Sequence, residues 1–439
     1  MAGSTKQRRR VSSAGPGAGT RTGTRDCEVL IAGGGLVGLT LGIALADAGL
    51  DVIVIDRDAP AAVQAATFDG RASAIARGSQ QALAAIGLWD AMAAAAQPIE
   101  DIRVSDGRVG RPVSRLFLHY DCEEVDGAPL GYMLENRSIR AALHAKAPHT
   151  AGLRLLAPTQ VVDMSRDVHA CTVTLDDGRT LSAQLVVAAD GKRSRVRAAA
   201  GIPVTAWDYP QAGIVCTVAH AEPHHGTAHE NFLPSGPFAM LPLRDGDDGA
   251  GRRVHRSSIV WTEKRDLAAA MMTQDDATLS AEIQRRFGDS LGALDVIGPR
   301  WSYPLSLSLA KDTVAERFAL VGDAARGIHP ISGQGLNLGI KDVAALAEVL
   351  IDARRLGLDL GQVSVLRRYA RWRRFDNLTL IAVTDGLNRL FSNDAAPLRL
   401  ARDLGLAAVD RMPPLKRFFM RHAMGLVGDL PRLIRGEAL

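Results

Sequence analysis

The segment that most restricts the fold of this chain is a glycine motif close to its N-terminus. Residues 27–58 read CEVLIAGGGLVGLTLGIALADAGLDVIVIDRD: an apolar run, the motif Gly33-x-Gly35-x-x-Gly38, a helix-like stretch and a second apolar run that ends at Asp56. A strand, a glycine turn, a helix and a second strand in this order are typical of the first βαβ unit of a doubly wound α/β sheet. The sequence therefore predicts that fold for the N-terminal part of the chain.

Each glycine of the motif has its own physical role. Gly33 allows a tight turn, Gly35 lets the backbone approach a diphosphate, and Gly38 lets the helix pack closely on the strand. Free N–H groups at the helix N-terminus favour an anion, and Asp56 is placed to accept hydrogen bonds from ribose hydroxyls. The motif predicts an ADP-binding site and does not by itself distinguish FAD from NAD.

A second glycine-rich segment decides between these two cofactors. Residues 317–343 read RFALVGDAARGIHPISGQGLNLGIKDV, in which a short apolar strand ends at Asp323 and a loop with Gly333 and Gly335 leads into a helix. An aspartate at the strand end suits sugar or ribityl hydroxyls, and glycines let backbone amides approach a flat ring. The following helix N-terminus stabilises negative charge on a reduced flavin. This segment favours FAD.

The residue pattern of the remaining sequence indicates a β-rich domain inserted into the FAD-binding domain. Segments such as AGIVCTVAH, FAMLPLR and RSSIVWTE are strand-like, and the chain after Leu336 is almost wholly helical. Local patterns predict a helix over 73–96, another over 137–146 and a hairpin that turns at Asp177-Gly178. We expect this division: a disordered basic tail at 1–25; the FAD-binding domain at 26–100, 136–201 and 305–355; substrate-domain strands at 101–135; a β-rich substrate domain at 202–304; and a C-terminal helical region at 356–439.

Composition excludes several other classes of protein. A net charge of +4 is too small to imply nucleic acid as a partner, and the basic residues do not form one stripe. The four cysteines lie far apart without a CxxC spacing, which indicates reduced thiols in a cytoplasmic protein. There is no apolar run of about 18 residues that would span a bilayer. The basic N-terminal tail lacks the apolar residues that a targeting peptide needs.

Four histidines within ten residues raise the question of a metal site. They are His220, His224, His225 and His229. Pro223, Gly226 and the strand-like flanks argue against a helix that would align them, and no carboxylate or cysteine completes a convincing ligand set. We expect a solvent-exposed loop here and no metal.

A third motif makes the chain recognisable. LVVAADGKRSRVR resembles the Asp-Gly motif of flavoprotein aromatic hydroxylases, with Asp190, Gly191, Ser194 and Arg197 in its key positions. With the two glycine segments it completes the three motifs of the p-hydroxybenzoate-hydroxylase-like group. Segments such as DGRASAIARGSQQALAAIGLWD, MLENRSIRAAL, SGPFAMLPL and LFSNDAAPLRLARDLGL narrow the resemblance to the ubiquinone-biosynthesis hydroxylases. It covers the chain from Asp26 to its end.

The resemblance implies a role for each matching residue. Arg71 and Arg137 are similar to arginines that contact the FAD phosphates or flank the flavin, and Val161 to a residue whose backbone meets the adenine. Asp190 would lie near the diphosphate and the route of the nicotinamide donor. His329 and Pro330 fall in the loop expected beside the flavin, where His329 is a candidate for proton movement and equally a residue that only shapes the loop. The cofactor-binding set is Gly33, Gly35, Gly38, Asp56, Arg71, Arg137, Val161, Asp190, Asp323, Gly333, Gln334, Gly335, Leu336 and Asn337.

The same resemblance implies an FAD- and NAD(P)H-dependent monooxygenase. Reduced, non-covalently bound FAD would react with O2 to give a C4a-hydroperoxide, whose terminal oxygen passes to the ring of a polyprenylated phenol in ubiquinone biosynthesis. Two alternatives stay open: a flavoprotein hydroxylase or reductase that acts on another hydrophobic ring or isoprenoid, and a non-catalytic flavin-binding subunit of a biosynthetic complex.

The C-terminal sequence LKRFFMRHAMGLVGDLPRLIRG mixes aromatic and aliphatic residues with arginines. This pattern suits peripheral contact with an anionic membrane or an acidic partner, and it equally suits a helical cover on the FAD-binding domain. The polyprenyl substrate implied by the family favours the membrane. We therefore expect a cytoplasmic protein, peripherally associated with the inner face of the cell membrane and a possible member of a ubiquinone-biosynthesis protein complex.

Overall fold

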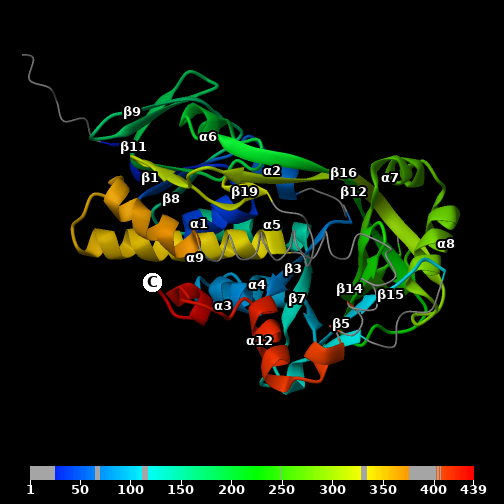
Figure 1. Ribbon diagram of the computed structural model, residues 1–439. Coiled ribbons are helices and arrows are strands. Elements are labelled where there is room, and N and C mark those ends of the chain that lie inside the picture. The colour runs from blue at the N-terminus through cyan, green and yellow to red at the C-terminus, as the bar shows by residue number, and fades with distance from the viewer. Residues whose placement is uncertain are drawn as a thin grey trace, which may run out of the picture.

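A computed structural model describes residues 25–64, 70–110, 117–248, 250–327, 334–374, 402, 405 and 407–439. These residues form three sheets with helices around them (Figure 1). All of the expected N-terminal tail except Arg25 lies outside the described residues, as does the loop that holds His329, Pro330 and Gly333.

The first sheet carries the predicted βαβ unit. Its parallel strands lie in the order β18-β11-β1-β2-β8, and α1 (Leu36–Asp47) connects β1 to β2. The strands are β1 (Cys27–Ala32), β2 (Val52–Ile55), β8 (Leu153–Leu156), β11 (Thr180–Ala188) and β18 (Phe318–Leu320), with β17 (Val314–Ala315) at one edge. β9 (Val161–Arg166) and β10 (Cys171–Leu175) continue from β11 as antiparallel strands, so the hairpin predicted at Asp177-Gly178 is confirmed.

The core of this sheet has two sides because successive side chains of a strand point to opposite faces. Val29 and Ile31 pack with α1, α5 (Asn136–Lys146) and α9 (Gln334–Arg355) on one face. Leu30 and Ala32 pack on the other face with β9, β10 and α6 (Arg195–Ala199). Burial on both faces explains why β1 and β2 are almost continuously apolar.

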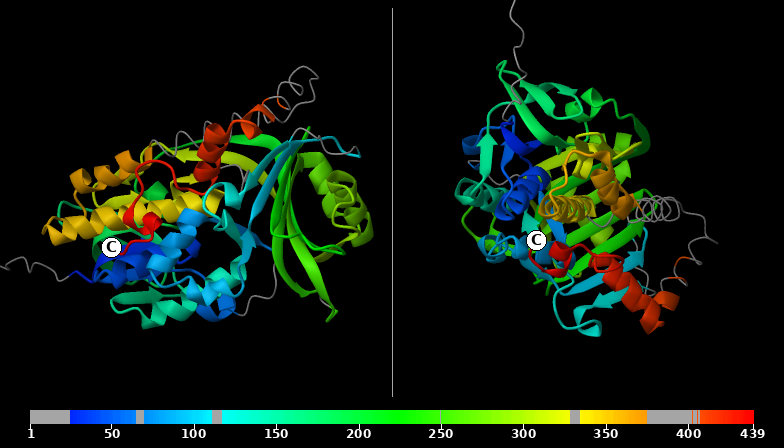
Figure 2. Two further views of the ribbon diagram at one scale, coloured as in Figure 1. Left: turned by 90° about the horizontal axis from the view of Figure 1, so that it is seen from below. Right: turned by 90° about the vertical axis from the view of Figure 1, so that its left-hand side faces the viewer.

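The second sheet has eight strands and stands at one end of the molecule (Figures 1 and 2). In spatial order they are β19 (Arg326–Gly327), β16 (Leu294–Ala310), β12 (Val204–His220), β15 (Arg253–Lys264), β14 (Gly236–Asp247), β13 (Thr227–Leu233), β5 (Asp101–Asp106) and β6 (Phe117–Asp121). All neighbours are antiparallel except β13 and β5. One face packs against α7 (Arg265–Met272) and α8 (Asp276–Phe287), where Trp261 and Phe238 are fully buried. The opposite face is turned toward the first sheet (Figure 2).

A small third sheet, in the order β3-β7-β4, joins the two larger ones. It contains β3 (Ala72–Ala76), β4 (Gln97–Ile99) and β7 (Gly131–Glu135). The helix expected over 73–96 is therefore wrong at its start, because residues 72–76 pair with β7 before α3 (Arg77–Ala85) and α4 (Asp90–Ala93) follow. Alanine disfavours strands only weakly, so the pairing with β7 decides whether this alanine-rich segment is a strand or a helix.

The described part of the C-terminal region is helical, as expected. α12 (Pro413–Ala423) lies against β6 and the β7 region, where Met420 and Met424 pack with Cys122 and Leu130 (Figures 1 and 2). The short helix η5 (Arg432–Arg435) packs on α3 and α9. Among the described helices, none combines the length and the apolar run that crossing a bilayer requires.

Candidate active site

The first glycine turn has the geometry that the sequence predicts. Gly33 has φ +106°, and a Cβ there would lie 2.5 Å from the carbonyl oxygen of Ala189. A Cβ on Gly38 would lie 1.9 Å from the carbonyl oxygen of Gly33. A side chain at either position would collide with backbone, so glycine is required for the packing of α1 on β1.

Gly35 differs because, apart from its chain neighbours, no atom of the described residues lies within 4 Å of the position that a Cβ would take. It precedes α1, whose first turn has no side-chain cap and no acidic residue. The first N–H groups of a 12-residue helix therefore stand beside open space at Gly35. This arrangement fits a diphosphate, which needs close backbone approach and donors on the helix axis.

Asp56 ends β2 beside the glycine turn. Its Oδ2 accepts a hydrogen bond from the Gly34 amide at 2.5 Å, and its Oδ1 accepts one from the Asp58 amide at 2.7 Å. These bonds fix the carboxylate, and each oxygen keeps a second lone pair for a ribose hydroxyl. Val161 is the buried first residue of β9, on the opposite face of the sheet from α1.

The Asp-Gly motif forms a turn that contacts the second cofactor segment. The Oδ2 of Asp190 accepts from the Arg195 amide at 2.9 Å, whereas its Oδ1 is buried with no hydrogen-bond partner among the described residues. Arg197 donates to the carbonyl oxygens of Ala324 at 2.8 Å and Lys192 at 3.2 Å. A buried carboxylate oxygen without a partner is costly, which fits a site that a ligand donor completes.

Asp323 and the first turn of α9 line one cavity. The protein around Asp323 displaces water from its carboxyl group and raises the pKa of that carboxyl above its usual value, although the side chain is open to the cavity. Gln334, Gly335 and Leu336 also line the cavity, and among the described residues, its chain neighbours aside, none has an atom within 4 Å of a Cβ on Gly335. Asn337 connects this turn to β3, because it accepts a hydrogen bond from the Ala76 amide and donates one to the Ala74 carbonyl oxygen. Open backbone beside a helix N-terminus fits the flat ring of a flavin, as the second glycine segment predicts.

The two predicted arginines have different surroundings. Arg71 lines the cavity with its guanidinium 5.6 Å from the ring centre of Trp301. Arg137 lies at the start of α5 and donates from Nε to Glu135 at 2.6 Å, and Arg256 contacts the same carboxylate at 3.0 Å. Arg71 is thus beside the proposed flavin region, and Arg137 stands outside the cavity lining.

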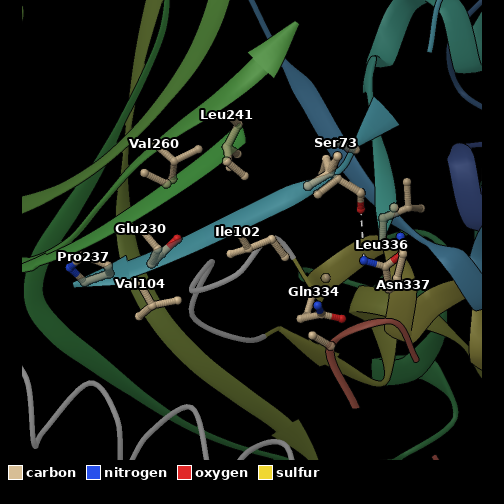
Figure 3. A pocket seen from close by; sticks show the side chains of 18 of the residues that line it. Ser73, Ile102, Val104, Glu230, Pro237, Leu241, Val260, Gln334, Leu336 and Asn337 are labelled. Atoms are coloured by element: carbon tan, nitrogen blue, oxygen red, sulfur yellow. Dashed lines mark hydrogen bonds between the residues drawn. The ribbon is translucent and has the colours of Figure 1, made fainter. Parts of the chain in front are cut away.

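The cavity has a volume of about 1120 Å³ and lies between the first turn of α9, the small sheet, the inner face of the second sheet and α12. Figure 3 shows Gln334, Leu336 and Asn337 on one side of it and Val104, Glu230, Pro237 and Val260 on another. A cavity of this size that is walled mostly by apolar side chains fits a hydrophobic ligand next to the cofactor. Sequence reasoning missed this wall, Glu230 included, because the strand register determines which residues face inward.

The histidine segment is not the exposed loop that we expected. His220 is buried at the end of β12, where its ring nitrogens contact the Glu222 carbonyl oxygen at 2.7 Å and the Ser257 hydroxyl at 3.0 Å. His229 lies in β13 with its ring against Phe287. Only His225 of the four is exposed. No group of three or more potential ligands suited to a metal ion occurs among the described residues.

The basic C-terminal residues fall into two groups. Arg417 and Arg421 are exposed on α12 together with Phe418 and Phe419. Arg432 instead pairs with Asp352 at 2.6 Å and Glu348 at 3.2 Å, so it contacts other parts of the protein. The structure thus contains both a helical cover and an exposed amphipathic surface, and these use different arginines.

Comparisons with known proteins identify the family. The model of the FAD binding domain family matches residues 26–373. The ubiquinone hydroxylase UbiL of Rhodospirillum rubrum is 51% identical over 96% of both chains, and the 3-demethoxyubiquinol 3-hydroxylase of Escherichia coli is 35% identical over 91% of this chain and 98% of its own. The crystal structure of p-nitrophenol 4-monooxygenase PnpA from Pseudomonas putida has the same fold, with a TM-score of 0.75 and 21% identity over 91% of this chain and 98% of its own. This chain therefore belongs to the FAD-dependent monooxygenases of ubiquinone biosynthesis.

Proposed function

We propose that this protein hydroxylates the ring of a polyprenylated phenol on the route to ubiquinone, with NAD(P)H as electron donor and O2 as co-substrate. The proposal rests on one observation: an apolar cavity reaches both the cofactor residues, Asp323 and 334–337, and the inner face of the second sheet. The relatives named as ubiquinone and demethoxyubiquinol hydroxylases support the substrate class.

Different cofactor residues bind different parts of FAD. We assign the diphosphate to the open backbone at Gly35 and the start of α1, a ribose to Asp56, and the ribityl chain to Asp323. The flavin ring falls to residues 334–337, with Arg71 nearby. When bound, FAD supplies the redox chemistry, in which it accepts electrons from NAD(P)H and activates O2.

The protein contributes enclosure and position. Val104, Val260 and Leu241 wall the cavity with apolar side chains, which limits the water that reaches the reacting atoms. We also propose that the cofactor site includes Arg137, Val161 and Asp190, together with His329, Pro330 and Gly333. The last three lie outside the described residues.

The tail of the substrate needs a route out of the cavity. Phe419 and Met420 of α12 line the cavity together with Met424 just after the helix, and Phe419 is at the same time 40% exposed. We propose that the isoprenoid tail leaves beneath α12, where Phe418, Arg417 and Arg421 contact the surface of an anionic membrane. Reversible binding to the membrane would also bring the protein close to other enzymes of the pathway.

One assay tests the central proposal. The FAD-loaded protein is incubated with NAD(P)H, ¹⁸O-labelled O2 and a phenol that carries two isoprene units. We expect a product heavier by one labelled oxygen atom, formed in step with NAD(P)H consumption. Consumption of NAD(P)H without any labelled product from this and longer-tailed phenols would contradict the proposal.

A further inference from the structure

A carboxyl group stands alone in the apolar wall of the cavity. Glu230 lies in the middle of β13, and its side chain points into the cavity among Val104, Pro237 and Val260 (Figure 3). Among the described residues that line the cavity, Glu230 and Asp323 are the only acids. Asp323 belongs to the cofactor side, so Glu230 is the acid on the substrate side.

Strand register explains why this residue faces the cavity. Glu230 pairs with Val104 of β5 and with Ala239 of β14, and Ala239 pairs in turn with Val260 of β15. Directly paired residues point to the same face of a sheet. The row continues through Val215 to Trp301, and every member of it lines the cavity. Glu230 is thus the one polar side chain in a row of apolar ones.

The protein offers this carboxyl no partner within the described residues. Its surroundings provide no hydrogen bond and no nearby charge that favours the ionised form, and burial alone raises its pKa from 4.5 to about 7. The other charged groups of the lining are already engaged: Arg402 pairs with Asp106 at 2.8 Å, Lys192 bonds Ser306, and Arg71 lies over Trp301. A carboxyl group enclosed by apolar side chains and without a partner is costly to keep, which points to a ligand that completes it.

We propose that Glu230 binds the ring hydroxyl of the substrate by accepting its hydrogen bond. This inference rests on the proposed function, because a prenylated phenol brings one such donor into an otherwise apolar site. As the ring reacts, the phenol O–H bond breaks, an O–H bond forms on the carboxylate, and the negative charge passes to the ring oxygen. That charge enriches the ortho and para carbons, which are the positions that an electrophilic oxygen attacks.

The proposal predicts that the protein distinguishes a phenol from its methyl ether. Dissociation constants of a diprenylated phenol and of its O-methyl ether are measured by calorimetry on the FAD-loaded protein. At a pH well above 7, where the Glu230 carboxyl is ionised, we expect wild type to prefer the phenol by about 10- to 100-fold, as is usual for a hydrogen bond to a charged group. Glu230→Leu should bind both ligands equally, and Glu230→Gln should keep a preference of only a few-fold.

Thr262→Val provides the matched control. Thr262 also lines the cavity from the second sheet, and valine has its shape without the hydroxyl. This variant should keep the wild-type preference. An unchanged preference in Glu230→Leu, with normal FAD content, would overturn the assignment of Glu230 alone. Failure of wild type to bind or hydroxylate any prenylated phenol would overturn the proposed function and this inference together.

Discussion

The Nη2 atom of Arg326 lies 2.6 Å from both carboxylate oxygens of Asp342, and both side chains are buried. Asp342 also accepts from Arg373 at 2.8 Å and from the Gly322 amide at 3.0 Å. One carboxylate of α9 thereby holds β19, the turn that contains Asp323, and the helix that follows α9. It therefore connects described residues on both sides of residues 328–333.

Asp342→Asn should therefore be strongly destabilising. The change leaves two buried guanidinium groups without their anion, for which a loss of about 3–5 kcal/mol is usual. The free energy of unfolding is measured in urea with FAD bound. Asp58→Asn is the control, because its contact with Arg57 is exposed and should contribute less than about 1 kcal/mol. Equal stability of the two variants would show that the buried network has no such role.

Gly35→Val should abolish FAD binding without unfolding the protein. Within the described part of the chain, no atom beyond the chain neighbours lies where this side chain would go, so the loss falls on the diphosphate that we place there. We expect the variant to retain no flavin and the unfolding temperature of the FAD-free protein to stay the same. Flavin absorbance after gel filtration measures the first quantity. Normal flavin content in the variant would place the diphosphate elsewhere.

The Glu230 carboxyl should make stability depend on pH. Its pKa is about 7 in the folded protein and 4.5 in the unfolded chain, so the unfolded state releases the proton first as the pH rises. Wild type should therefore lose stability relative to Glu230→Gln between pH 4.5 and 7, by roughly 3 kcal/mol in total, and the difference should be constant above that range. Thermal unfolding of both proteins at a series of pH values checks this. A difference that stays constant across the series would mean that Glu230 is ionised in the folded state as easily as in water.

Arg417→Glu combined with Arg421→Glu should weaken binding to vesicles of anionic lipid. Each basic residue near such a surface contributes about 1 kcal/mol, so reversal of two charges should reduce binding by about tenfold or more. Flavin content and turnover of a short-tailed phenol should not change. Arg432→Glu should behave differently, because it breaks contacts with Glu348 and Asp352 and lowers stability instead. Vesicle binding equal to wild type in the double variant would leave α12 as a helical cover only.

The sequence predicted those parts of the fold whose signal is local. The turn at Gly33 and Gly38 requires glycine for steric reasons, so the spacing of these glycines in a single sequence is enough to predict it. The flanking elements β1, α1 and β2 are predicted with it. β3 was mistaken for helix because its strand state depends on β7, about 60 residues further along the chain. Glu230 was missed for a related reason: the sequence HENF does not show which face of β13 meets the cavity, and only the pairing with Val104 and Ala239 settles this.

The pairing of Ala188 with Leu320 has a consequence for the way the chain folds. β18 adds to the first sheet beside β11 only after a loop of about 130 residues has closed, and such closure costs entropy that only later contacts repay. Five of the eight strands of the second sheet, β12 to β16, lie within that loop. If these strands pair first, the ends to be joined come closer and the cost falls. The region that receives the substrate would then fold before the sheet that holds the flavin is complete. FAD would bind last and stabilise the assembled protein.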